Sequence, residues 1–218
     1  ENTALVSLEG LAGITSVAGD VEINDNTVMQ TLSPPALASI DGDLIVFRNP
    51  ALASLGLTSL TGVGGRVEIR SNAVLLSCDA PTLTSVDGDL TFDGNPSFTS
   101  LGLDSITQVG GSLHITDNSS LPICESQELT SVGDDLVIHT NPLLTSLSMS
   151  SLRHVGGNLR ILENPLLPTC EAYALADQLV GFAGNVEIQG NDHPCDPNPC
   201  TTGTCIMDCT AENDHVCN

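Results

Sequence analysis

The acidic residues are the side chains whose type and spacing come closest to a chemical site. Three pairs of aspartates recur along the chain. They are Asp41 with Asp43, Asp87 with Asp89, and Asp134 with Asp135. Carboxylate oxygens are hard ligands that suit Ca²⁺, so calcium bridged by these pairs is the one cofactor that the sequence suggests. No regular calcium-binding loop accompanies the pairs, and acids on a water-exposed face need no metal, which is the interpretation we favour.

Other residue types give little support to catalysis. The five histidines are scattered, and no serine or cysteine nucleophile motif accompanies them. Nothing marks one carboxylate of a pair as the buried, proton-holding acid that general acid–base chemistry uses. We therefore expect a protein that is not an enzyme.

The overall charge restricts the partners. The sequence has 27 acids against 5 bases, a formal net charge of −22, and all five bases are arginines. Such a chain repels phosphates and anionic lipids, which excludes nucleic acid and membrane surfaces, and it argues against a lyase acting on acidic polysaccharides. The longest apolar runs fall far short of the roughly 20 residues that span a bilayer, so no membrane insertion is expected.

The cysteines indicate the compartment. Five of the eight lie between Cys195 and Cys217, a density typical of oxidising surroundings. The sequence also begins at Glu1 without a basic, apolar leader, as a processed secreted protein does. We expect an extracellular or cell-surface location; the alternative, a zinc site near Cys205 and Cys209, lacks an evident second pair of ligands. The candidates for disulfides are Cys170, Cys195, Cys200, Cys205, Cys209 and Cys217.

A repeat positions all of these residues. Asparagines recur every 23 residues up to Asn164, and one more follows after 27. Apolar columns lie three and five residues before each asparagine, the alternation of a β-strand. The expected fold is therefore all-β, a solenoid of about eight coils. Hydrogen bonds between stacked amides would satisfy the backbone at one corner. The stacked residues are Asn26, Asn49, Asn72, Asn95, Asn118, Asn141, Asn164 and Asn191.

Two further columns lead to specific expectations. Cys78 and Cys124 share a column with leucines, so we expect them to be buried free thiols. They lie two coils apart, roughly 9.6 Å at about 4.8 Å per strand, which is too far for a disulfide. A glycine column that includes Gly65 and Gly111 precedes the strands and indicates a tight corner where φ > 0 is available.

The last interval of 27 residues predicts a cap on the stack. Ala172, Leu175, Ala176 and Leu179 have helical spacing, and Thr169 is suited to the N-cap, so a short helix is expected near residues 170–179. Such a helix would cover the end of the solenoid. Because five tail cysteines cannot all pair among themselves, we choose Cys170 with Cys195 as a disulfide at this end.

Two segments resemble known families. The run from Leu83 to Leu90, followed by Asn95, Pro96 and Leu101, resembles the repeat of receptor L domains. That resemblance covers about residues 8–192 and implies a right-handed β-helix with leucine-rich-repeat character; a leucine-rich-repeat horseshoe is the alternative. The run from Cys195 to Cys205 resembles the start of an EGF-like module, which implies a Cys195–Cys205 pairing that conflicts with the cap disulfide. The expected domains are therefore residues 1–192, the solenoid, and residues 193–218, a small disulfide-rich tail.

Function follows less directly from these features. We expect a non-enzymatic extracellular structural or adhesive module, a subunit of a cell-surface filament or surface layer, whose partners are further copies or other surface proteins. The alternative is recognition of a glycan or another ligand on the solenoid face. A third possibility is ice binding, because a regular column of threonines resembles the surfaces of ice-binding β-solenoids. That column is Thr15, Ala38, Thr61, Thr84, Thr107 and Thr130.

Overall fold

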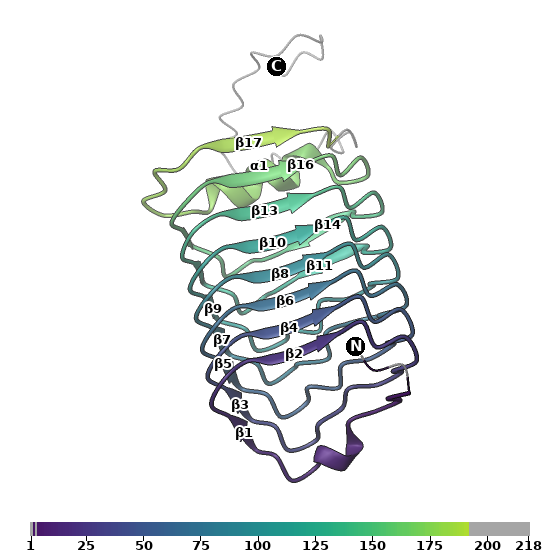
Figure 1. Cartoon of the computed structure of the whole chain (residues 1–218). Coiled ribbons are helices and arrows are strands. Elements are labelled where there is room, and N and C mark those ends of the chain that lie inside the picture. The colour runs from purple at the N-terminus through teal and green to yellow at the C-terminus, as the bar shows by residue number, and fades with distance from the viewer. Residues whose placement is uncertain (1, 3, 192–218) are drawn as a thin grey trace, which may run out of the picture.

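The computed structural model describes residue 2 and residues 4–191 of the chain. These residues form a β-solenoid of about eight coils, each of roughly 23 residues, as the repeat predicts. In Figure 1 the chain runs from left to right along the front of the stack and rises with each coil toward the C-terminal end. The solenoid is therefore right-handed. Each coil packs mainly on the coils before and after it, as in other solenoids.

The front of the stack in Figure 1 is a parallel sheet of eight strands, here the large sheet. Its strands pair in register at steps of 23 residues, as in Val67 with Leu90, and the last step is 27, from Leu159 to Val186. In spatial order the strands are β2 (Val21–Asn24), β4 (Leu44–Phe47), β6 (Val67–Arg70), β8 (Leu90–Asp93), β10 (Leu113–Thr116), β13 (Leu136–His139), β16 (Leu159–Leu162) and β17 (Val186–Gln189).

Two other sides complete each coil. A small parallel sheet of two-residue strands precedes the large sheet, and a third side holds the paired strands β11 (Ile123–Glu125) and β14 (Ser146–Ser148) together with isolated bridges such as Thr31 with Ser54. A 3-10 helix, η1, spans Glu9–Leu11. The small-sheet strands are β1 (Ser16–Val17), β3 (Ser39–Ile40), β5 (Gly62–Val63), β7 (Ser85–Val86), β9 (Gln108–Val109), β12 (Ser131–Val132) and β15 (His154–Val155).

The core is a set of stacked aliphatic columns. Inward residues of the large sheet, such as Leu90 and Ile115, are buried, while their neighbours along each strand face outward. Two phenylalanine rings also lie among these mostly aliphatic columns. Phe92 and Phe98 are both fully buried and stack with their ring centroids 5.3 Å apart. Phe92 lies in β8 and Phe98 follows it in the same coil, so the pair joins two sides of that coil.

A helix covers part of the C-terminal end. Helix α1 spans Thr169–Asp177 and packs against β14 and β17, with Ala172 and Leu175 buried. The predicted helix is present, but its N-cap position is held by Pro168 and not by Thr169. The Thr169 hydroxyl instead donates a hydrogen bond to the carbonyl of Asn191, which ties the helix to the last coil. Among the described residues no helix is long and apolar enough to cross a membrane.

Candidate functional site

The asparagine column forms a continuous hydrogen-bonded ladder inside the solenoid. At Asn72 the backbone N–H donates to Oδ1 of Asn95 at 3.0 Å, and the side-chain amide donates to the carbonyls of Val46 at 3.1 Å and Arg70 at 3.0 Å. Oδ1 of Asn72 accepts the backbone N–H of Asn49 at 3.0 Å. All eight asparagines are buried. The ladder therefore satisfies the backbone at a dry corner and presents no side chain to a ligand.

A second ladder runs along the corner between the small and large sheets. Oδ1 of Asp43 accepts the backbone N–H of Arg66 at 2.9 Å, and Oδ1 of Asp89 accepts that of Ser112 at 2.7 Å. The same contact recurs from Asp135 to Asn158 at 2.6 Å. We call this column the corner ladder. Its acids lie at a water-exposed corner, and each also accepts a backbone N–H of the next coil. The sequence did not predict this second role.

The corner ladder explains the neighbouring glycine column. None of these glycines has a positive φ, so the expectation that the corner uses a left-handed backbone at glycine is wrong. Residues with positive φ lie elsewhere, and several of them come directly before a ladder asparagine, as at Asp25 and Ser71. A Cβ on Gly65 would instead collide with the Asp43 carboxylate and lie 2.7 Å from the Gly42 carbonyl carbon. Glycine is required there because the adjacent coil approaches so closely.

One exception supports this explanation. In the sixth coil Asp134 replaces the glycine, and in the coil before it Ser112 replaces the ladder aspartate. The shorter Ser112 side chain still meets the ladder, with its hydroxyl 3.3 Å from the N–H of Asp135. A larger residue at the glycine position therefore coincides with a smaller one in the corner ladder of the coil beneath it.

The structure places the six calcium candidates along this corner. Asp43, Asp89 and Asp135 each use Oδ1 in the corner ladder, while the other three acids of the pairs are exposed. Within the described part of the chain, no three or more histidine, cysteine, aspartate or glutamate side chains form a group that could hold a metal ion. Calcium binding by these pairs thus stays a prediction without a preformed cluster.

The arginines are held by contacts within the solenoid. Four of them pair with acids: Arg48 with Asp25 (2.7 Å), Arg66 with Asp43 (3.0 Å), Arg70 with Asp93 (2.9 Å) and Arg160 with Glu187 (3.4 Å). Arg153 donates to the carbonyls of Ser150 and Leu152, both at 2.8 Å. Each acid in these pairs comes from an adjacent coil. The four paired arginines therefore bridge neighbouring coils.

The threonine column is a third hydrogen-bonded array. The hydroxyl of Thr84 donates to the carbonyl of Thr61 at 2.9 Å, and those of Thr107 and Thr130 repeat this contact at 3.0 and 2.9 Å. A threonine hydroxyl that donates to a carbonyl of the preceding coil has no donor left for ordered water, although its lone pairs stay available. The column primarily joins successive coils.

The cysteines have two different environments. Cys78 and Cys124 are free thiols, fully buried in the core. Burial, reinforced by Asp79, raises the pKa of Cys78 to about 12, and burial, reinforced by Glu125, raises the pKa of Cys124 further. Such thiols are poor nucleophiles and poor metal ligands. Cys170, in α1, is disulfide-bonded; its expected partner Cys195 and the other four candidates lie outside the described residues.

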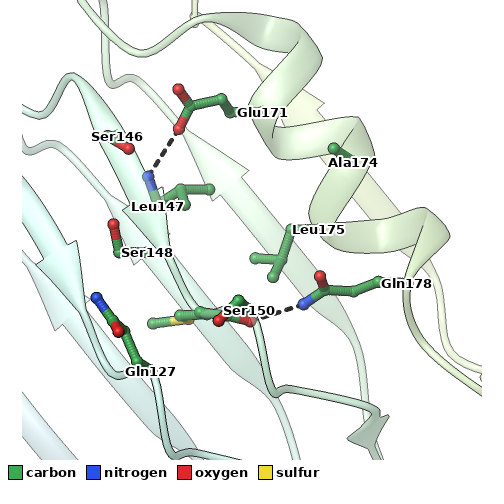
Figure 2. Close-up of a pocket in the computed structure, with 10 residues that line it drawn as sticks. Gln127, Ser146, Leu147, Ser148, Ser150, Glu171, Ala174, Leu175 and Gln178 are labelled. Atoms are coloured by element: carbon green, nitrogen blue, oxygen red, sulfur yellow. Dashed lines mark hydrogen bonds between the residues drawn. The ribbon is translucent and has the colours of Figure 1, made fainter. Parts of the chain in front are cut away.

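A cavity of about 460 Å³ lies between β14 and α1, and Figure 2 shows its lining. The helix takes the place of the next strand on the third side, so its side chains hydrogen-bond to the backbone groups at the edge of β14. Glu171 accepts the N–H of Leu147 at 2.8 Å, and Gln178 donates to the carbonyl of Met149 at 2.8 Å. The hydroxyls of Ser146 and other serines line the remaining space. Only the break in the 23-residue spacing hinted at this site in the sequence.

Comparison with known proteins adds no relative. No protein-family model, no curated protein and no solved structure matches the chain.

Proposed function

We propose that the protein is a non-enzymatic extracellular structural or adhesive module, a subunit of a cell-surface filament or surface layer. The observation that carries this proposal is the use of polar side chains to hold coil to coil. Buried amides, corner carboxylates, threonine hydroxyls and paired arginines each bridge neighbouring coils. Such a stack resists bending and gives a rod of roughly 38 Å, at about 4.8 Å for each of eight strands.

We assign the solenoid to the receptor L-domain-like type on the strength of its coil sequence, and the cysteine-rich residues 193–218 to an EGF-like extension. The density of cysteines supports a secreted protein.

Assembly is the property that tests the proposal. Purified, oxidised protein would be followed by sedimentation velocity and negative-stain microscopy from low to high sodium chloride, with and without calcium. We expect concentration-dependent rods, filaments or sheets at high ionic strength, because salt screens the repulsion between copies that each carry a net charge of −22. Dispersed monomers under every condition would overturn the structural proposal.

The cavity at α1 favours one alternative, recognition of a glycan. Its lining combines serine hydroxyls, Gln127, Gln178 and the carboxylate of Glu171, groups that can exchange hydrogen bonds with sugar hydroxyls. A glycan array tests this alternative. A single saccharide class whose binding is lost in Ser148→Ala, with Ser119→Ala as the surface control, would support it. An empty array would leave the structural role as the better explanation.

A further inference from the structure

The cavity between β14 and α1 has one wall from each element. On the helix side it is lined by Glu171, Ala174, Leu175 and Gln178, which share one face of α1 and its C-cap at helical spacing. Glu171 and Gln178 reach the backbone of β14 at the two ends of this face, and the short side chain of Ala174 lies between them (Figure 2). The volume of about 460 Å³ is within the range of small-molecule sites. The space beside Ala174 is therefore large enough for a small molecule.

The carboxylate of Glu171 is only partly used by the protein. Its Oε2 accepts the N–H of Leu147 at 2.8 Å, and its Oε1 accepts no hydrogen bond from a described residue. Glu171 is half-buried, forms no ion pair within the described part of the chain, and is the one charged side chain among the described lining residues. A carboxylate in this position favours a positively charged donor, because a charge-assisted hydrogen bond is roughly twice as strong as a neutral one.

Three serine hydroxyls line the same cavity from the strand side. Ser146 and Ser148 lie in β14 and Ser150 follows it, so the three alternate with Leu147 and Met149 along the chain. Their hydroxyls form no hydrogen bond with another described residue, unlike the threonine hydroxyls that join successive coils. Each serine hydroxyl is therefore available both to donate to a ligand and to accept from it.

These groups are the complement of a ring that carries both an ammonium group and hydroxyls. A neutral sugar leaves the second oxygen of Glu171 without a charged partner. An acidic sugar is repelled by Glu171 and by the net charge of −22. A small cation without hydroxyls makes no use of the serines. An amino sugar uses both the carboxylate and the hydroxyls.

We propose that the cavity beside α1 binds an amino sugar that has a free ammonium group. The ammonium donates to Oε1 of Glu171, and the ring hydroxyls exchange hydrogen bonds with the serines of the strand wall, Ser146, Ser148 and Ser150. All of these contacts are noncovalent. This inference rests on the glycan-recognition alternative and names the class of saccharide that the site takes.

Titration of the purified, oxidised protein with matched monosaccharides, followed by NMR chemical shifts, tests the class of ligand. The probes are glucosamine, N-acetylglucosamine, glucose and glucuronate, which share a hexose ring and differ in charge. At about 0.15 M sodium chloride we expect glucosamine to bind about tenfold more tightly than the two neutral sugars, and glucuronate to bind most weakly. Ethanolamine, with one ammonium and one hydroxyl, measures the attraction of any small cation to this acidic chain. It should bind about tenfold more weakly than glucosamine.

Two variants locate the binding in the cavity. Glu171→Gln keeps an oxygen for the Leu147 N–H and removes the charge, so it should weaken glucosamine binding about tenfold and leave N-acetylglucosamine binding unchanged. The matched control, Glu22→Gln, makes the same change on β2 at the other end of the stack and should leave both affinities unchanged. Ala174→Leu fills the cavity and should remove binding of every saccharide, with circular dichroism confirming that the variant folds.

The outcomes separate this inference from glycan recognition in general. Equal affinities for glucosamine and glucose overturn the amino-sugar class and leave glycan recognition standing. Glucosamine binding that weakens equally in Glu171→Gln and Glu22→Gln, or that survives Ala174→Leu, indicates general attraction of a cation and overturns the inference. Absence of binding by every probe also overturns it, and the glycan array then decides separately whether another saccharide is recognised.

Discussion

Removal of one ladder asparagine should cost a large share of the stability of the solenoid. In Asn72→Ala the N–H of Asn49 loses its acceptor, and the carbonyls of Val46 and Arg70 lose a donor. A net loss of about 1 to 1.5 kcal/mol for each of these groups gives a cost of about 3–4 kcal/mol in the free energy of unfolding. Whole domains are stable by only about 5–15 kcal/mol, so the effect is easily measured.

Urea unfolding followed by far-UV circular dichroism measures this cost, with hydrogen exchange reporting whether neighbouring coils open together. Asn185→Ala is the matched control, because Asn185 is exposed at the end of the corner ladder and its backbone N–H keeps the contact with Asn158. We expect the control to lose less than about 1 kcal/mol. A loss below about 1 kcal/mol in Asn72→Ala, or equal losses in both variants, would refute the assignment of the ladder as a main source of stability.

Three further predictions concern the columns. Cys78 and Cys124 should resist thiol reagents until denaturant is added. Folding raises the pKa of Cys78 from 9.0 to about 12, so the Cys78 thiol loses its proton at lower pH in the unfolded chain than in the folded protein. The free energy of unfolding, measured by urea titration, should therefore fall as the pH rises from about 9 toward 12. Gly65→Asp should lower the free energy of unfolding by about 1–3 kcal/mol through overpacking. Adding Asp43→Ser to the same chain should recover part of this loss, measured by thermal melting. Equal melting temperatures of the single and double variants would contradict the steric explanation. Thr84→Val should cost about 0.5–1.5 kcal/mol by losing one hydrogen bond, and neither it nor the parent should produce thermal hysteresis in ice-growth assays.

The period of 23 was enough to predict most of the fold. A fixed spacing places equivalent residues in one column, so Val67, Leu90 and Leu113 had to be neighbours once the coils were taken as stacked, and the observed pairings agree. The free thiols could be placed for the same reason, since neighbouring coils hold leucine in the same column, as at Leu55 and Leu101. What a strict repeat determines is position within a coil and the identity of the neighbour above and below.

The sequence was less informative where the distance between coils matters. The need for glycine at Gly65 depends on the Asp43 carboxylate of the preceding coil, and a single coil read alone suggested a turn with positive φ instead. The stacked pair Phe92 and Phe98 depends on space shared between two sides of the coil. The cavity beside α1 arises where the 23-residue period is interrupted. An interrupted repeat indicates that the local structure changes, but it does not predict the new structure.

Because the coils are in strict register, the length of the solenoid is set by the number of coils. Cys78 and Cys124 stand 46 residues apart in one column, and the same 46-residue spacing relates the paired coils around them. Insertion of one such unit would lengthen the rod by about 9.6 Å and leave both ends unaltered. Insertion of a single residue within a strand would turn its inward side chains outward. Length can therefore change by duplication of whole units, in steps, while the surfaces that meet a neighbour stay the same.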